Sequence, residues 1–513
     1  MKASKISYQE TNKFSNLVLD YLKNDENLKP FVNHFPILEN FKKQMVEKKS
    51  HLLDRIVLVD VLNKQNSSLS LSKKSKSNID SLKENSTFTV TTGHQLCLFT
   101  GPLYFIYKII STINLAEQLQ AKYLNNNFVP VFWLASEDHD FQEINHINLF
   151  GKKIAWESKQ SGPVGRMNLN GFEKILKELK SVLGNSKNSD KLIALFEKSY
   201  LNHDNLADAT RYLVNELFGK YGLVILDGDD KELKEQFIST IKRDVLTNSF
   251  QKTILKCSKD LSNKYKAQAF VRPINFFKLS QGKRILIKDK VSEKEIENNP
   301  AIFSPNVLLR PLYQEIILPN IAYIGGGAEL SYWMQLKTAF HQEKIPFPIL
   351  VLRNSVLFLD DKQDSKFKLF GLSLEDLFMD EHQLHKKFVL NQNDTFVSLN
   401  DELVAIEAIY DQIKAKNTDL GILNSINSHQ IKQLKSFKQL EEKLLRVAKQ
   451  KNQISLNQIS KIIKKLFPNN SLQERYCNFI PFYLNNGDKF IEILKDNLNP
   501  LNPNFVVLSP KIK

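Results

Sequence analysis

A short polar segment, Thr-Gly-His-Gln at residues 92–95, is the first whose residue types could carry chemistry. Ligands bind open parallel sheets beyond the carboxyl ends of the strands, and free N–H groups at a helix start favour phosphate or carboxylate there. Gly93 allows the backbone to approach a ligand, while His94 and Gln95 could donate hydrogen bonds to a developing negative charge. The segment therefore predicts an anion-binding turn; a tight turn with a satisfied polar pair is the alternative.

Four ionisable residues in a row, Glu137, Asp138, His139 and Asp140, form the second candidate. They follow an apolar segment typical of a buried strand, so we expect them at the same sheet edge as Gly93. We interpret Glu137 as a substrate-binding residue and Asp138, His139 and Asp140 as catalytic. In this interpretation His139, oriented by a carboxylate, is the general base for an amine. A polar loop whose acids cap the next helix ranks second.

A metal site ranks third for the same segment. On a helix, His139, Glu143 and His146 would share one face and could ligate a divalent cation. Since the spacing fixes no coordination geometry, we assign no metal ligand.

The third candidate combines Arg310, the glycine run 325–327 and Glu329. Arg310 could bind a carboxylate through two hydrogen bonds, and three glycines between a strand and a helix indicate close contact with a ligand. Glu329 could stabilise the helix start or hold a substrate ammonium group. The glycine spacing is not that of a dinucleotide fingerprint, which disfavours NAD. The same neighbourhood supplies further predicted substrate-binding residues, namely Gln314, Tyr323, Tyr332 and Trp333.

A polar triplet lies near the C-terminus, in the segment Leu-Gln-Glu-Arg at 472–475. It follows a long helical region and could close the site or fix those helices to the core. We include Arg475 among the predicted substrate-binding residues.

The elements that must position these residues alternate between strand and helix. Residues 87–91 and 128–134 predict buried strands, and a helix from Pro102 to about Gln120 connects them. Strand, helix and strand in this order form a βαβ unit, so the predicted fold class is α/β with a parallel sheet. The other predicted elements are helices within 12–62, strands at 221–226, 270–287, 321–324 and 347–352, a helix at 329–342, and a C-terminal strand at 505–508.

Beyond about residue 395 the apolar spacing becomes that of a coiled coil. A 4-3-4-3 seam predicts one helix, Gly421 interrupts, and a second helix repeats the alternation. Two antiparallel helices joined by a short turn fit this pattern, and such a hairpin is more often a packing or dimerisation arm than a catalytic element. The seam residues are Leu399, Leu403, Ile406, Tyr410 and Ile413, then Phe437, Leu440, Leu444 and Val447.

The chain has 513 residues, enough for two or more domains, and a net charge of +15. An anionic partner such as RNA is one interpretation of this charge, and a dispersed basic surface is the other. The lysines are scattered among acids and no RNA-binding signature occurs, so we expect no nucleic-acid partner.

Three features bear on the compartment. No run of about eighteen apolar residues occurs, the N-terminal lysines have no apolar stretch behind them, and the three cysteines follow no metal or disulfide spacing. We therefore expect a cytoplasmic protein without a membrane partner.

Together these segments, in this order, resemble one family, the bacillithiol biosynthesis cysteine-adding enzymes called BshC. The resemblance extends over nearly the whole chain. It departs from the family pattern at His94, where the family often has Gln, and at Gly326-Gly327, where it commonly has Gly-Pro. The matching segments are 90–95, 98–104, 107–108, 131–141, 310–314, 322–326, 329–333 and 472–475.

The resemblance implies a Rossmann-like core related to class I aminoacyl-tRNA synthetases and nucleotidylyltransferases, with connecting inserts and a C-terminal coiled-coil arm for homodimerisation. The implied division is 1–150 for the N-terminal helices and first half of the core, 151–310 for the connecting inserts with further core strands, 311–375 for the second half of the core, 376–470 for the arm, and 471–513 for the return to the core.

The implied reaction joins the carboxyl group of L-cysteine to the amine of glucosaminyl-malate and gives bacillithiol, the last step of its biosynthesis. Amide formation from a free carboxylate is uphill, so activation is expected. ATP or another adenine nucleotide is a candidate source, and no cofactor is fixed by the resemblance. Because the family often has Gln at the place of His94, we expect Gly93 and Gln95, rather than His94, to matter for binding.

Three alternatives stay open. The first is another adenylate-forming or nucleotidyl-transfer enzyme, acting on RNA. The second is a metal-dependent hydrolase using His139, Glu143 and His146. The third is a scaffold without catalytic activity that uses the coiled coil.

Overall fold

The computed structural model describes residues 1–392 and 398–510. Its centre is a five-stranded parallel sheet in the spatial order β11-β10-β2-β3-β6. The chain therefore runs outward from β2 in one direction and then, starting at β10, in the other, which is the strand order of a Rossmann-like sheet. This confirms the predicted fold class. The strands are β2 (Thr87–His94), β3 (Asn127–Leu134), β6 (Val224–Asp227), β10 (Asn320–Gly325) and β11 (Ile349–Leu352).

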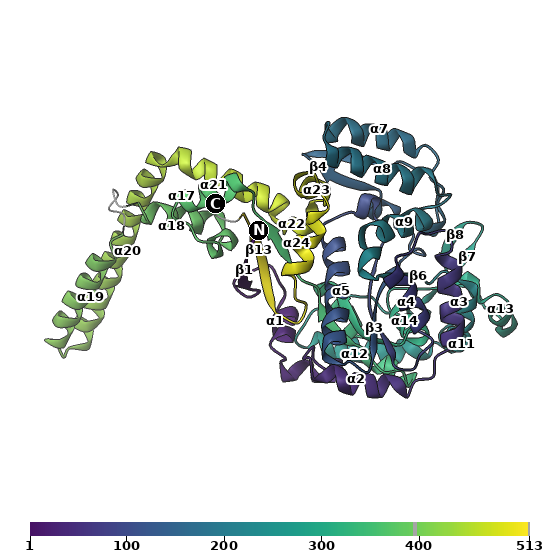
Figure 1. Ribbon diagram of the computed structural model, residues 1–513. Helices are drawn as coiled ribbons and strands as arrows, with labels where there is room; N and C mark the ends of the chain where they lie inside the picture. The colour runs from purple at the N-terminus through teal and green to yellow at the C-terminus, as the bar shows by residue number, and fades with distance from the viewer. Residues whose placement is uncertain (393–397, 511–513) are drawn as a thin grey trace.

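Both faces of this sheet are covered, as the uninterrupted apolar run of β3 predicts. Val129, Val131 and Trp133 join one core cluster, whereas Phe132 and Leu134 face another. The connecting helix α5 (Tyr104–Lys122) packs against both β2 and β3 (Figure 1). The predicted βαβ unit is thus confirmed. The N-terminal helices are α1 (Asn16–Leu22), α2 (Asn40–Lys49), α3 (Arg55–Gln65) and α4 (Lys73–Ser81).

Two predicted elements differ in the structure. The helix expected at 329–342 is split into α15 (Gly327–Met334) and α16 (Lys337–Gln342). The buried side chain of Gln335, at the break, bonds both the N–H and the carbonyl of Ala269. Of the expected strands at 270–287, only β7 (Phe276–Ser280) and β8 (Lys283–Leu286) form, joined by the predicted turn at 281–282. The segment before them is irregular because it is bonded to Gln335 instead of to a strand.

The inserted segments form smaller layers around the sheet. A hairpin of β4 (His146–Leu149) and β5 (Lys152–Ala155) precedes α7 (Phe172–Leu183), α8 (Lys187–Leu201) and α9 (Leu206–Phe218). Farther along, α10 (Lys231–Glu235), α11 (Ile238–Thr247) and α12 (Ser249–Ser262) lead to the antiparallel sheet of β7, β8 and β9 (Phe303–Pro305). Helix α14 (Arg310–Ile317) then returns the chain to β10.

A separate sheet joins the two ends of the chain. Its order is β1-β13-β12, with β1 (Lys2–Ser7) antiparallel and β12 (Val356–Phe358) parallel to β13 (Asn504–Ser509). The predicted C-terminal strand is therefore confirmed.

The coiled-coil hairpin is confirmed as α19 (Asn400–Ala415) and α20 (Leu420–Lys451), which extend away from the sheet (Figure 1). Gly421 lies within the first turn of α20 and does not interrupt a helix. Ile413, Leu440 and Val447 were expected in the seam but are 40%, 46% and 51% exposed. In α20 the next residues along the helix point inward instead, since Glu441 accepts from the Leu399 N–H and Ala448 is buried. The finer division of the chain at 150, 310, 375 and 470 stays a prediction. None of the described helices is long and apolar enough to cross a membrane.

Candidate active site

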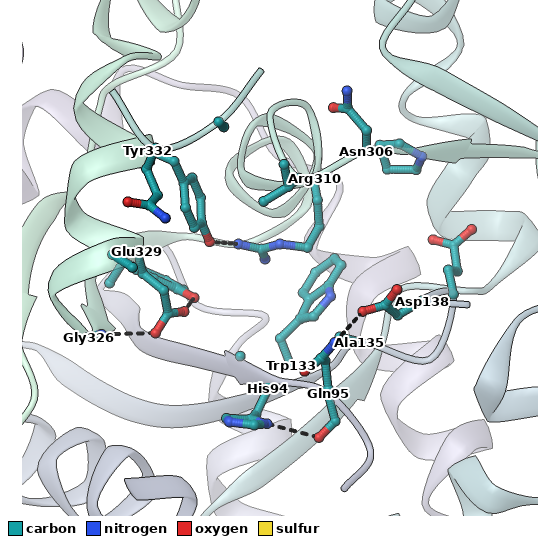
Figure 2. A pocket seen from close by; sticks show the side chains of 18 of the residues that line it. His94, Gln95, Trp133, Ala135, Asp138, Asn306, Arg310, Gly326, Glu329 and Tyr332 are labelled. Atoms are coloured by element: carbon teal, nitrogen blue, oxygen red, sulfur yellow. Dashed lines mark hydrogen bonds between the residues drawn. The ribbon is translucent and has the colours of Figure 1, made fainter. Parts of the chain in front are cut away.

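A cavity of about 880 Å³ lies at the carboxyl edge of the parallel sheet, where the strand order reverses. Residues that end or follow β2, β3, β6, β10 and β11 line its floor, and the segments around 268–272 and 305–310 line its walls. Figure 2 shows this pocket. The predicted site residues among its lining are Gly93, His94, Gln95, Glu137, Asp138, Arg310, Tyr323, Glu329, Tyr332 and Arg475.

Arg310, the first residue of α14, lies among aromatic rings. Its guanidinium carbon is 5.9 Å from the ring centroid of Trp133, 5.7 Å from that of Tyr323 and 6.0 Å from that of Trp333. It donates hydrogen bonds to the Tyr332 hydroxyl at 3.5 Å (Figure 2) and to the Gln314 Oε1 atom at 3.0 Å. Within the described ranges it forms no ion pair with a carboxylate. A guanidinium group without a carboxylate partner can bind the carboxylate or phosphate of a ligand.

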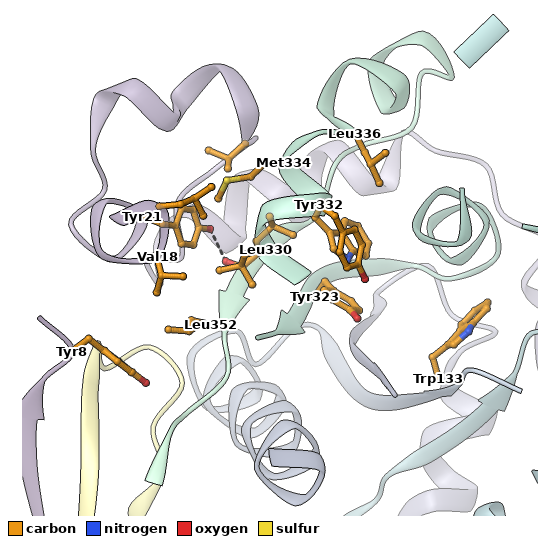
Figure 3. Close-up of a cluster of buried hydrophobic side chains, with 14 of the residues drawn as sticks. Tyr8, Val18, Tyr21, Trp133, Tyr323, Leu330, Tyr332, Met334, Leu336 and Leu352 are labelled. Carbon is orange, nitrogen blue, oxygen red and sulfur yellow. Dashed lines mark hydrogen bonds between the residues drawn. The ribbon is translucent and has the colours of Figure 1, made fainter. Parts of the chain in front are cut away.

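Two predicted substrate-binding residues act behind this group instead of lining the cavity. Trp333 is fully buried and stacks on Tyr323 with centroids 4.4 Å apart. Gln314 is also fully buried and accepts a hydrogen bond from Arg310, which lines the cavity. Figure 3 shows Tyr323 and Tyr332 continuing into the apolar core beside Leu330.

Glu329 is the acidic counterpart on the same side of the cavity. Its carboxylate accepts hydrogen bonds from the Tyr323 hydroxyl at 2.7 Å, the Gly326 N–H at 2.8 Å and the Lys108 ammonium at 2.8 Å. Burial raises its pKa, but the Lys108 charge and the hydrogen bonds outweigh burial and hold the pKa below its ordinary value. The protein therefore satisfies Glu329 internally, which favours the predicted role at the helix start over that of an ammonium site.

The opposite wall, after β3, is acidic. The Gln95 amide donates to Asp138 Oδ2 at 2.7 Å and to Glu143 Oε2 at 2.8 Å (Figure 2 draws the first of these). Glu137 pairs with the buried ammonium of Lys234 at 2.6 Å. Burial raises the pKa of Glu137 despite this neighbour. Both residues line the cavity, Glu137 with its charge compensated by Lys234 and Asp138 with its carboxylate held by the Gln95 amide.

His139 and Asp140 lie beside the cavity and do not line it. The His139 ring is 45% exposed, and its Nδ1 atom lies 3.1 Å from an Arg284 N–H group. Because a guanidinium only donates, this nitrogen accepts, and the lone pair expected of a general base is engaged. Asp140 is exposed at the start of α6 (Phe141–Ile144), and its side chain caps nothing. Their catalytic roles stay predictions, and the geometry favours Asp138 over both.

His94 lines the cavity between two rings, 5.3 Å from Tyr104 and 5.1 Å from Phe105. Burial, and then the charge of Lys108, lower its pKa to about 3. The ring is therefore neutral near pH 7, in line with the expectation that it is not essential for proton transfer.

The N–H groups expected at the start of the helix after His94 are not offered to a ligand. Leu103, just before α5, is fully buried and donates its N–H to the Cys477 carbonyl at 2.8 Å. The Asn478 amide covers the preceding turn by bonding the carbonyls of Phe99 and Gly101. The Leu103 N–H is therefore not free for a ligand, because a C-terminal segment packs on this helix end. The glycine turn before α15, with Gly326 and Gly327, faces the cavity instead.

The shared helix face proposed for a metal is also absent. Helix α6 has four residues, and His146 lies beyond it in β4. Glu143 is bonded to Gln95, and His139 to Arg284. Among the described residues, no group of three or more His, Cys, Asp or Glu side chains is arranged to hold a metal ion.

Comparisons with known proteins agree with this fold. A family model described as "Bacillithiol biosynthesis BshC, N-terminal Rossmann-like domain" matches residues 1–354, and one described as "C-terminal coiled-coil domain" of BshC matches 356–510. The chain belongs to the BshC family.

Several curated relatives match along their full length. A protein of Flavobacterium johnsoniae is 43% identical over 98% of this chain and 99% of its own. One of Christiangramia forsetii is 42% identical over 99% of each chain, and one of Bacillus cereus is 26% identical over 94% and 95%. Each is named "Putative cysteine ligase BshC". Membership of this family makes the chain an enzyme of the ligase class.

The BshC C-terminal domain contributes directly to the cavity of the N-terminal domain. Gln473 bonds the N–H and carbonyl of Phe358 in β12 at 2.9 and 3.1 Å. The fully buried Glu474 accepts from the Arg353 guanidinium at 2.7 Å and from the Val356 N–H at 3.1 Å. These bonds fix the short helix α22 (Gln473–Tyr476), from which Arg475 lines the cavity. Both predicted roles of the triplet, closing the site and fixing the helices, have a structural basis.

Several cationic residues of this BshC cavity were not predicted. Arg353 directly follows β11, in the position that other site residues hold after β2, β3 and β10, and this placement was a usable signal. Lys108 lies on the buried side of α5, where a lysine among apolar residues indicates a partner. Nothing local distinguishes the arginines contributed by the inserts. With Arg310 and Arg475, the cationic lining is Lys108, Arg272, Arg284 and Arg353.

Proposed function

We propose that this chain joins the carboxyl group of L-cysteine to the amine of glucosaminyl-malate, giving bacillithiol in the last step of its biosynthesis. Family membership and the names of the relatives support the ligase class and the use of cysteine. The observation that carries the proposal is the polarity of the cavity. In the part of the chain that the structure describes, the Arg310 guanidinium on one wall has no carboxylate partner, while Glu137 and Asp138 line another wall. Both substrates contain carboxylates and an amine, which this arrangement can bind separately.

In the proposed reaction, Arg310 binds a substrate carboxylate and the acidic wall receives the sugar amine as an ammonium ion. Asp138 accepts a proton from that ammonium group, which frees the nitrogen lone pair. The nitrogen then bonds to the carbonyl carbon of cysteine, and the bond from this carbon to its leaving oxygen breaks. The second proton of the nitrogen leaves with the released oxygen group, so that a neutral amide forms. Gln95, bonded to Asp138, keeps the carboxylate in place.

The proposed ligation needs an activated cysteine carboxyl group. An adenine nucleotide such as ATP, when bound, would supply a leaving group on the cysteine carboxyl. The lining fits an anionic group of that kind, since the exposed guanidinium of Arg475 and the glycine turn at Gly327 line the cavity. No contact on this wall selects adenine over another base.

We also propose that two copies associate through the α19–α20 arm. These helices bury few side chains: Ala448 is the buried residue of α20, and α19 has none. They expose several large apolar residues, including Val404, Ile409, Leu440 and Val447. Such a face on an extended hairpin is typical of an association surface.

The direct test is to mix the purified chain with cysteine and glucosaminyl-malate, with and without ATP, and to measure bacillithiol by mass spectrometry. Product formed with nucleotide but not without it would support the whole proposal. Product formed equally without nucleotide would support the ligation and would exclude ATP as the source of activation. No product in either mixture, with substrates recovered intact, would overturn the assignment.

A further inference from the structure

A buried ion pair lies beneath the cavity and is not part of the proposed reaction. Lys48 of α2 and Glu315 of α14 have fully buried side chains, with Nζ and Oε2 3.5 Å apart. The Lys48 ammonium also donates to the Glu315 carbonyl at 2.7 Å. Apolar residues of similar volume often replace such pairs without loss of stability, so stability alone does not explain why this pair is present.

The Glu315 carboxylate organises two neighbouring amides. Its Oε1 atom accepts a hydrogen bond from the Gln314 amide at 2.9 Å and from the Asn320 amide at 2.6 Å. Asn320 in turn accepts from Thr89 and Thr91 of β2, the strand that ends at the cavity. One buried charge therefore connects α2, α14, β10 and β2.

The consequence for Gln314 is a fixed amide orientation. A side-chain amide has one donor end and one acceptor end, and a carboxylate can only accept. Because the nitrogen of Gln314 faces Glu315, its oxygen must face the other way, toward the Arg310 guanidinium at 3.0 Å. The Gln314 oxygen thereby fixes one edge of the Arg310 guanidinium group, and aromatic rings surround that group.

We propose that Gln314 and Glu315, with Lys48 as the countercharge of Glu315, are positioning residues that orient Arg310 for a carboxylate of the substrate. The chain Lys48–Glu315–Gln314–Arg310 leads from the interior to the cavity and contacts the ligand only at Arg310. The inference rests on the proposed function, because that function supplies the carboxylate.

The experiment measures how strongly the enzyme distinguishes carboxylates from their esters. Dissociation constants for glucosaminyl-malate and for its dimethyl ester are determined by calorimetry, and their ratio reports the carboxylate contacts. Two variants are compared with the unchanged chain. Q314M removes the acceptor for Arg310 and leaves the ion pair intact. K48M combined with E315Q removes both charges together, so that no unpaired charge is buried.

We expect the ratio to fall roughly 10-fold in Q314M, the size of a lost charge-assisted hydrogen bond, with the ester affinity and kcat nearly unchanged. The fall should be smaller in the double variant, because the amide oxygen of a glutamine at position 315 can still accept a hydrogen bond from Gln314. A matched control is K387M combined with D376N, which removes a buried-acid ion pair at the base of the arm and should keep the ratio. An unchanged ratio in Q314M, or equal weakening of diacid and ester, would overturn the positioning role while leaving the ligase proposal intact. If the unchanged chain binds neither compound, the proposed function itself falls, and this inference with it.

Discussion

Two charged side chains of the same cavity, Arg310 and Glu329, have opposite surroundings. Glu329 receives hydrogen bonds from a lysine, a tyrosine and a backbone N–H group, so all its charge is compensated by the protein. Arg310 is held by an amide, a hydroxyl and aromatic rings, none of which carries a negative charge. The sequence suggested a ligand for both. The difference teaches that charge compensation, more than charge, separates a binding group from a structural one.

The largest effect on substrate binding is expected at Arg310, whose charge is not compensated by a carboxylate of the described residues. Arg310→Met should weaken binding of glucosaminyl-malate about 100-fold, because a charge-assisted pair with a carboxylate is lost. Arg310→Lys should recover little, since an ammonium group cannot reproduce the two-pronged geometry. Calorimetry on the three proteins checks this. Near-normal affinity in Arg310→Met would show that Arg310 is not the group that binds the substrate carboxylate.

Glu329→Gln should act on stability before it acts on binding. It leaves the Lys108 ammonium buried without its partner, which should cost about 3 kcal/mol and lower the urea midpoint. The double variant Lys108→Met, Glu329→Gln should regain most of that loss.

The pH dependence gives Glu329 a second signature. Its folded-state pKa is lowered, so the stability it contributes is present at neutral pH and lost as the pH falls below the ordinary range of a glutamate. Unfolding of the Glu329→Gln protein should therefore depend less on pH in mild acid. An identical acid profile would show that the carboxylate is not compensated as described.

His94 offers a smaller effect with a defined sign. Burial, and then Lys108, lower its pKa from 6.5 to about 3. Between these values the unfolded chain binds a proton that the folded chain does not, so stability falls as the pH drops below 6.5. His94→Gln should remove this loss and keep product formation within about 3-fold at pH 7.5, since a neutral ring contributes at most an ordinary hydrogen bond. Thermal unfolding between pH 7.5 and 5 measures the first effect; a large drop in product formation would give His94 a direct role.

The arm should show the smallest effect on the cavity. Leu440→Glu places a charge on its exposed apolar face and should shift the protein toward monomers in light scattering, with substrate affinity unchanged. Gln439→Glu, at the next exposed position on the same helix, changes the net charge by the same amount and is the matched charge control. A dimer that withstands Leu440→Glu would place the association surface elsewhere.

The regular parts of this fold were accessible from the sequence because each has a local pattern. A β-branched and aromatic run marked β2, an uninterrupted apolar run marked β3, and a 4-3-4-3 spacing marked α19. The register of α20 failed at Leu440 and Val447, since the apolar residues there form two candidate stripes and only the packing against α19 selects one.

Within the site, the sequence indicated residues that follow strands, such as Asp138, but could not rank their roles. The engagement of His139 depends on Arg284, which lies far away in the chain, and the covered start of α5 depends on Cys477. Such relations between distant segments leave no periodic signal. The arginines that the inserts contribute to the cavity, Arg272 and Arg284, likewise have no local sequence signal.

The bonds of Gln473 and Glu474 have a consequence for chimaeric proteins. A junction near residue 355, where the two family models meet, would separate Glu474 from Arg353 and Arg475 from the cavity it lines. An arm exchanged between distant relatives must therefore bring a compatible polar triplet, or the hybrid loses a wall of its active site. Recombination that respects domain boundaries would still damage catalysis here, so the two halves should be inherited as one unit.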